Sequence, residues 1–184
     1  MTKLKIAMLV GSVRTGSLNE KLARAVESLA PDTLQFDRVR IDDLPHYNGD
    51  LEAARPLEVT RFTDQLREVQ GTFFVTPEYN RSIPGMLKNA IDWGSKPMSG
   101  NVWTGKTAGM IGTSPGAIGT AVGQQHLRQI LSVLGVTVVP SEAYISFIRP
   151  DLISDTGDVA DDGTRAFIQA YVDRFAKMAL RLVD

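Results

Sequence analysis

A segment near the N-terminus has the residue types of an anion site. It reads Gly11-Ser12-Val13-Arg14-Thr15-Gly16-Ser17-Leu18-Asn19 and joins an apolar run to a predicted helix start, where free N–H groups and the helix dipole favour an anion. Its neutral hydrogen-bond donors are Ser12, Thr15, Ser17 and Asn19. Arg14 adds a guanidinium suited to phosphate oxygens. A monophosphate on a short polyol fits best, because neither a Gly-Lys-Ser/Thr ending nor a GxGxxG pattern is present.

The residues of that segment also allow a simpler interpretation. Ser17 and Glu20 have the spacing of a capping box, so Ser17 could do no more than cap a helix, and the glycines no more than form a turn. Glu20 would also repel a phosphate slightly. From these residues alone, both interpretations stay open.

A second segment, Pro77–Gly85, has prolines near both ends that hold it stiff. We therefore expect the backbone N–H groups of Glu78–Asn80 to be presented to a planar heterocycle. A rigid turn without a ligand is the alternative, and we assign Asp92 and Trp93, in the helix that follows, to structure. A third segment, Thr113–Gly119, has small residues that would let a flat ligand approach the backbone, although a plain helix-start turn would look the same.

Strand and helix patterns alternate along the whole chain. The strands are predicted at Leu4–Val10, Leu34–Arg40, Thr72–Thr76, Thr107–Thr113 and Val136–Val139, the last with Ala143–Ile148 as part of one strand or as its pair. Helices are predicted from Leu18 to Pro31, after Pro56, from Pro84 with Gly94 beyond its end, and up to Gly135. The C-terminal helix has the expected seam Phe167, Tyr171, Phe175, Met178 and Leu182. Asp151–Gly163 is predicted to be a solvated loop.

This alternation predicts an α/β fold: a three-layer sandwich with a five-stranded parallel sheet and helices on both faces, in a single domain over residues 1–184. Ligands of such sheets bind beyond the carboxyl ends of the strands, where the strand order reverses. The three segments described above follow the first, third and fourth strands, so we expect them to form one site.

The composition excludes several classes of function. Twenty Lys and Arg against 21 Asp and Glu leave no basic field for nucleic acid, and no apolar run is long enough to cross a membrane. No signal peptide is evident, so a cytoplasmic location is expected. With no Cys and only His46 and His126, thiolate chemistry is excluded and a metal centre is not expected. We expect His126 on a helix surface or interface, and His46 in a loop that could border the site.

The first segment and the run Thr76–Trp93 (Thr-Pro-Glu-Tyr-Asn-x-Ser-Ile-Pro-Gly-x-Leu-Lys-Asn-Ala-Ile-Asp-Trp) together resemble the NADPH-dependent FMN reductase family of flavodoxin-like proteins. The resemblance extends from Leu4 to Arg128. It implies a bound FMN, NADPH or NADH as co-substrate, and a small-molecule acceptor such as a quinone, chromate, an azo dye or free flavin. It also implies a homodimer or homotetramer, for which we expect contacts through the Pro84–Trp93 helix and the helix around Leu127.

The resemblance further implies which residues hold the flavin. The phosphate and ribityl end would contact Ser12, Arg14, Ser17, Leu18 and Asn19. The ring would lie along Pro77, Glu78, Tyr79 and Asn80, with Ser114 and Gly116 on its third side. The resemblance assigns no role to Arg81, which is a candidate for binding substrate because its charge could favour the extra phosphate of NADPH. No catalytic side chain is expected, because the flavin carries the chemistry in an alternating exchange of substrates.

Two other functions remain compatible with the sequence. One is an FMN electron carrier or redox sensor that never meets NAD(P)H, although the small net charge of -1 is unlike the acidic surfaces of dedicated carriers. The other is a flavin-free hydrolase or transferase that uses Glu78 as its acid–base group.

Overall fold

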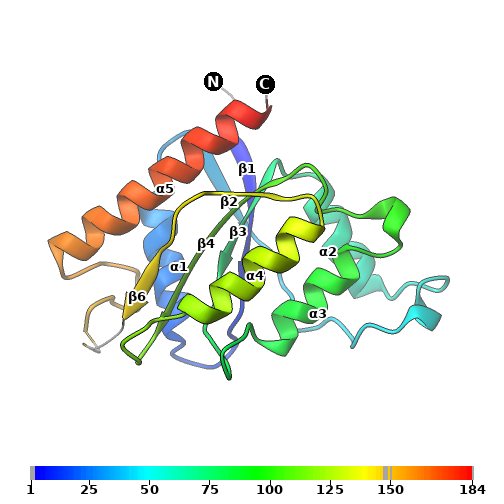
Figure 1. Ribbon diagram of the computed structural model, residues 1–184, viewed down its shortest axis with the longest axis horizontal. Helices are drawn as coiled ribbons and strands as arrows, with labels where there is room; N and C mark the ends of the chain where they lie inside the picture. The colour runs from blue at the N-terminus through cyan, green and yellow to red at the C-terminus, as the bar shows by residue number, and fades with distance from the viewer. Residues whose placement is uncertain (1–2, 147–148, 150, 184) are drawn as a thin grey trace.

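A parallel sheet lies between two layers of helices in the computed structural model, which describes residues 3–146, 149 and 151–183 (Figure 1). The strands are β1 (Leu4–Val10), β2 (Leu34–Arg38), β3 (Gly71–Val75), β4 (Thr107–Ser114), β5 (Thr137–Val138) and β6 (Tyr144–Ser146). The helices are α1 (Leu18–Ser28), α2 (Leu57–Arg67), α3 (Gly85–Gly94), α4 (Ala121–Val133) and α5 (Asp162–Val183), with short 3-10 turns at Gly49–Leu51 and Met98–Gly100. The predicted α/β sandwich is confirmed, with element ends shifted by one or two residues.

The strand order is β2-β1-β3-β4, followed by β5 and β6, which both pair with β4. All of these pairs are parallel, and Val10, Val75 and Ile111 lie in register on neighbouring strands. The order reverses between β1 and β3, because β2 lies on the far side of β1. The chain therefore leaves β1, β3 and β4 at one edge of the sheet, at the switch point where such folds bind ligands.

The fifth strand is a pair of short strands rather than one. β5 pairs with the first residues of β4, and β6 pairs with the last residues of β4, from Gly112 to Ser114. Between them the chain leaves the sheet around Pro140, which has no N–H to donate to a ladder. The N–H of Met110, which faces this gap, donates to the phenol oxygen of Tyr171 in α5 at 3.0 Å. Phe147 and Ile148, the predicted end of this strand, lie outside the described residues.

The two faces of the sheet have separate apolar cores. One packs the sheet against α1 and α5, and the other packs it against α2, α3 and α4 (Figure 1). The predicted seam of α5 is partly wrong: Tyr171 and Phe175 are buried, but Phe167 and Leu182 are about half exposed. The buried stripe also includes Ile168, Val172, Ala176 and Ala179. Small residues hold α5 close to the sheet, where larger apolar residues would not fit.

The prediction for Asp151–Gly163 is also wrong in part. Leu152, Ile153 and Val159 are buried in the core beneath α1 and α5, and Ile153 pairs with Val159 in an antiparallel bridge. The many acidic residues of this segment give it the composition of a solvated loop, although its apolar residues are buried. The segment is therefore a packed turn rather than a solvated loop.

Gly94 is the last residue of α3 rather than a residue beyond its end. A Cβ there would lie 2.5 Å from the indole nitrogen of Trp103. That nitrogen donates to the carbonyl of Ile91 at 2.9 Å, so the indole packs closely against the end of the helix. Gly94 thus serves close packing and does not provide a left-handed cap. Gly135, by contrast, ends α4 with a φ of 79°, as predicted.

Candidate functional site

The three segments singled out in the sequence meet at the carboxyl edge of the sheet. Gly11 N–H donates to the carbonyl of Val75 at 2.8 Å, which fastens the first segment to the end of β3. The amide of Asn19 donates to the carbonyl of Thr113 and accepts from its N–H, at 3.0 and 3.1 Å. Asn19 thereby continues the pairing of β4 at the point where β3 has turned away at Pro77.

The first segment is open to solvent from Val13 to Gly16. Ser17 caps α1, accepting from the N–H of Glu20 at 3.3 Å, so the simpler interpretation of this residue is confirmed as one of its roles. The side chain of Arg14 and the N–H groups of Thr15 and Gly16 make no hydrogen bond with any described residue. Free donors and an exposed guanidinium at a helix start suit an anion such as a phosphate monoester.

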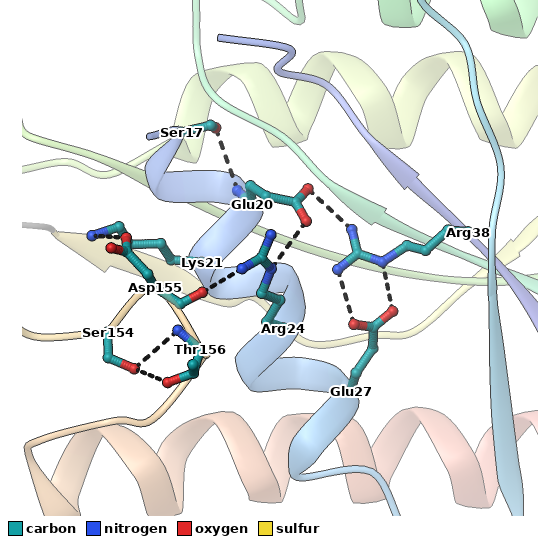
Figure 2. Close-up of polar contacts among 9 residues, drawn as sticks. All are labelled: Ser17, Glu20, Lys21, Arg24, Glu27, Arg38, Ser154, Asp155 and Thr156. Atoms are coloured by element: carbon teal, nitrogen blue, oxygen red, sulfur yellow. Dashed lines mark hydrogen bonds and ion pairs between the residues drawn. The ribbon is translucent and has the colours of Figure 1, made fainter. Parts of the chain in front are cut away.

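The carboxylate of Glu20 does not oppose this use. Figure 2 shows it between two guanidinium groups: it accepts from Arg38 at 3.2 Å and from Arg24 at 3.4 Å. Arg38 also makes a two-pronged contact with Glu27. These carboxylates raise the pKa of Arg38 despite its partial burial. The expected repulsion between Glu20 and a phosphate is therefore offset by its neighbours.

The second segment is a tight turn. Tyr79 and Ser82 exchange both backbone hydrogen bonds, at 2.9 and 3.0 Å, and Asn80 and Arg81 between them have φ values of 51° and 66°. The expectation that N–H groups across Glu78–Asn80 are free is therefore wrong for Tyr79, whose N–H donates to Ser82 within the turn. The N–H groups of Glu78 and Asn80 make no hydrogen bond with the described residues, and the ring of Tyr79 is half exposed.

Glu78 fastens this turn to the start of α4. Its side chain is 8% exposed, one oxygen accepting from the N–H of Gly123 at 2.9 Å and the other from Arg81 at 3.2 Å. His126, one turn further along α4, places Nδ1 3.2 Å from the hydroxyl of Ser82. Because both carboxylate oxygens are engaged, Glu78 is poorly placed to act as an acid–base group. Arg81, the substrate-binding candidate, is exposed beside it.

The third segment is held by two serine hydroxyls, one of its own and one from β6. Ser114 donates to the carbonyl of Gly119 at 2.6 Å and accepts from the N–H of Gly116 at 3.3 Å. Ser146 in β6 donates to the carbonyl of Gly116 at 3.0 Å. Behind this segment Gly112 has no room for a side chain, since a Cβ would lie 2.2 Å from the carbonyl oxygen of Thr76. Small residues thus bring the second and third segments together.

A contribution that sequence reasoning missed is that of Asn89 in α3. Its amide accepts from the N–H of Tyr47 at 2.8 Å and donates to the carbonyl of Pro45 at 2.9 Å. Trp93, buried as expected, donates to the same carbonyl at 2.7 Å. Together they hold the loop that carries His46, which is exposed. Asn89 and Trp93 lie one helical turn apart, and this spacing is the sequence signal that both side chains lie on the same face of α3.

The described residues place no three His, Cys, Asp or Glu side chains where they could share a metal ion. Nor does any helix among them have the length and apolar character needed to cross a membrane. The donor set is instead made of backbone N–H groups, hydroxyls and the guanidinium of Arg14. This set fits a phosphorylated heterocycle.

Solved structures define the class of fold. The chain superimposes on the flavoenzyme NAD(P)H:(acceptor) oxidoreductase FerB from Paracoccus denitrificans with a TM-score of 0.91, at 42% identity over 97% of this chain and 98% of the other. A flavodoxin variant from Pseudomonas aeruginosa, at 20% identity, gives a TM-score of 0.57 over 97% of this chain and 99% of the other. The protein is thus an α/β protein of the flavodoxin-like class.

Sequence comparisons identify the family. Residues 4–149 match the family described as NADPH-dependent FMN reductase. A 2-hydroxy-1,4-benzoquinone reductase from a Burkholderia species is 44% identical over 94% of both chains. A quinone reductase from Pseudomonas putida is 47% identical over 93% of this chain and 92% of the other. The chain belongs to the NADPH-dependent FMN reductase family, and it is an oxidoreductase that uses FMN with NAD(P)H as co-substrate.

Proposed function

We propose that the flavin lies across the three segments at the carboxyl edge of the sheet. In this proposal the phosphate and ribityl end is held by Ser12, Arg14, Ser17, Leu18 and Asn19. The ring lies along Pro77, Glu78, Tyr79 and Asn80, with Ser114 and Gly116 closing the third side. The observation that carries the proposal is the convergence of the three segments at the β1–β3 switch point, where the Arg14 guanidinium has no hydrogen-bond partner among the described residues.

The contacts of these residues suggest different roles for them. Arg14 and the free N–H groups of the first segment bind the phosphate, while Asn19 positions that segment by its two hydrogen bonds to Thr113. The free N–H groups of Glu78 and Asn80 face the ring, held in place by the turn. Arg81 stays a candidate for binding the extra phosphate of NADPH, although its ion pair with Glu78 must then be exchanged.

Bound FMN supplies the redox chemistry, accepting a hydride from NAD(P)H and delivering two electrons to an acceptor. The protein supplies binding, orientation and fixed dipoles near the ring. We infer that co-substrate and acceptor use the same open face in turn, which is a ping-pong mechanism. The names of the relatives favour a quinone as acceptor, and chromate, azo compounds and free flavin are further candidates of the same flat or small electrophilic kind.

The cofactor assignment is tested by the absorption spectrum of the purified protein. We expect a flavin spectrum after reconstitution with FMN, and bleaching of it when NADPH is added without oxygen. A colourless protein that does not bind FMN would contradict the proposal. A flavin that NADPH and NADH both fail to bleach, but that a chemical reductant bleaches, would indicate the electron carrier instead.

The order of substrates is tested by steady-state kinetics. Initial rates with NADPH and a benzoquinone, each varied at several fixed levels of the other, should give parallel lines in a double-reciprocal plot. Intersecting lines would contradict alternating use of one face. The same assay with chromate, an azo dye and free FMN ranks the acceptors by kcat/KM.

We further propose that the single domain formed by residues 1–184 assembles into a homodimer or homotetramer through α3 and α4. A groove of about 590 Å³ lies between these helices, and its apolar lining includes Ile83, Ile130 and the largely exposed Val133. A carboxylate in such a groove should prevent assembly. Light scattering of Val133→Asp should therefore show a smaller species than wild type, and an unchanged mass would place the contact elsewhere.

A further inference from the structure

A pocket at the start of α1 contains more positive charge than the proposed phosphate site uses. It has a volume of about 440 Å³, and its lining includes three cations, Arg14, Lys21 and Arg24, and two acids, Glu20 and Asp155. Glu20 is already engaged by Arg24 and Arg38. Asp155 comes from the distant turn before α5 and reaches into this pocket from outside the helix (Figure 2).

The turn that carries Asp155 is rigid. The hydroxyl of Ser154 accepts from the N–H groups of Thr156 and Asp158, at 3.2 and 3.0 Å. The Asp158 carboxylate accepts from the hydroxyls of Thr156 and Ser154, at 2.6 and 3.1 Å. Ser154 and Asp158 also pair through their backbones at 2.9 Å. These contacts fix the shape of the turn without using Asp155.

The same turn is docked on α1 through its backbone. Gly157 has a φ of 95°, and a Cβ there would lie 2.7 Å from the backbone carbon of Arg24. The guanidinium of Arg24 donates to the main-chain carbonyl of Asp155. Backbone contacts therefore hold the turn in place, and the carboxylate of Asp155 is not needed for its docking on α1.

That carboxylate lies 2.8 Å from the ammonium of Lys21, whose side chain is 20% exposed. Lys21 is in the first turns of α1, since its N–H donates to the carbonyl of Ser17. The ammonium and the Arg14 guanidinium thus line the same pocket. Lys21 in turn lowers the pKa of Asp155, as expected for a carboxylate beside a cation.

We propose that Lys21 is a second cation of the phosphate site and that Asp155 is its built-in counter-ion, which limits how tightly FMN is held. This inference rests on the proposed function. A phosphate monoester carries close to two negative charges at neutral pH and is the natural partner for Lys21 and Arg14 together. Asp155 competes with it for Lys21, so the charge available to the phosphate is smaller than the three cations would provide.

Asp155→Asn tests this, because asparagine has nearly the same shape and keeps the main-chain contacts of the turn. We expect the Kd for FMN, measured by quenching of flavin fluorescence, to fall about three- to fivefold at low salt, in the range of exposed ion pairs. The gain should shrink as salt is added. The Kd for riboflavin, which lacks the phosphate, should not change.

A double-mutant cycle identifies the cation involved. Lys21→Gln alone should raise the Kd for FMN, by a smaller factor than the gain from Asp155→Asn because Asp155 already competes for Lys21, whereas Lys21→Gln combined with Asp155→Asn should remove the gain. Asp151→Asn is the matched control: it makes the same change of net charge in the same segment, but Asp151 pairs with Arg149 and does not line the pocket. It should leave both affinities unchanged.

Three results would overturn the inference: weaker FMN binding by Asp155→Asn, an equal change for FMN and riboflavin, or a gain that survives Lys21→Gln. An equal loss for both flavins would show that Asp155 acts only on structure. If wild type binds neither flavin, the proposed function itself fails, and this inference fails with it. A circular dichroism spectrum of each variant shows that the fold is kept.

Discussion

The two ends of the proposed flavin site are built in different ways. The phosphate end is exposed from Val13 to Gly16 and is held by the backbone bond from Ser17 to Arg14. The ring end, Pro77–Ile83, is a turn closed by two backbone bonds and fastened to α4 by Glu78. The phosphate end depends on a guanidinium, that of Arg14, which has no hydrogen-bond partner among the described residues and can bind an anion. The second depends on a backbone shape prepared in advance, which lowers the entropy lost on binding.

The largest effect is expected behind the ring end. Gly112→Ala would place a Cβ 2.2 Å from the backbone carbonyl oxygen of Thr76 and 2.2 Å from the hydroxyl oxygen of the buried Thr120. Overpacking of this kind costs about 3 kcal/mol, which corresponds to a Tm roughly 6–12 °C lower. Differential scanning calorimetry measures this. Gly116→Ala, where the nearest contact is 3.6 Å, is the control and should change the Tm little.

Arg14→Ala tests the phosphate end. Loss of a hydrogen-bonded charge should cost about 1.5–3 kcal/mol, which is roughly a ten- to hundredfold increase in the Kd for FMN. Riboflavin binding should not change, because the ring end is untouched. Arg174→Ala, an exposed arginine on α5, is the matched control in the same fluorescence titration. An unchanged FMN titration for Arg14→Ala would place the phosphate elsewhere.

Glu78→Ala tests the ring end and should act on both flavins. Without the contact to Gly123 the turn loses its charged contact with α4, and we expect the Kd for FMN and for riboflavin to rise about tenfold, the loss of one charged hydrogen bond. Glu78→Gln keeps an oxygen for Gly123 and loses only the exposed contact with Arg81, so its effect should be smaller. A protein that stays colourless and loses a hydrolytic activity in Glu78→Gln would instead support the acid–base alternative.

The smallest effect is expected at Gly16. Its φ of 69° is left-handed, and no atom lies within 4 Å of the point where a Cβ would stand, so Gly16→Ala introduces backbone strain without a clash. Such strain costs about 1 kcal/mol, or roughly 2–4 °C in Tm. Gly85→Ala, also without close contacts but with an ordinary helical backbone, should be neutral or slightly stabilising. A clash-like loss at Gly16 would mean that the phosphate end is packed more tightly than these distances indicate.

Much of the fold could be predicted from periodicity, because strands buried on both faces and helices with one apolar stripe have distinct patterns. The stripe of α5 was partly misplaced because its buried positions include Ala176 and Ala179, which carry little hydrophobic signal. In the same way, the acidic residues around Ile153 and Val159 hid a packed turn. Both errors concern residues whose burial depends on what packs against them.

For the site, the sequence predicted which segments meet but not how their polar groups are used. The engagement of the Tyr79 N–H depends on positive φ values at Asn80 and Arg81, residues that do not require them. The pairing of Asn19 with Thr113 joins residues 94 positions apart. The docking of Asp155 on α1 spans 131 positions between its carbonyl and Arg24. Contacts of this range leave no local pattern in the chain.

The divided outer edge of the sheet has a consequence for how copies of the protein can meet. An intact edge strand offers a row of unpaired backbone groups to which another chain can add. Here β5 and β6 are two and three residues long, the chain bends away between them at Pro140, and Tyr171 covers the N–H of Met110 from within. This side of the molecule is therefore a poor template for strand addition, which protects it from edge-to-edge aggregation at high concentration.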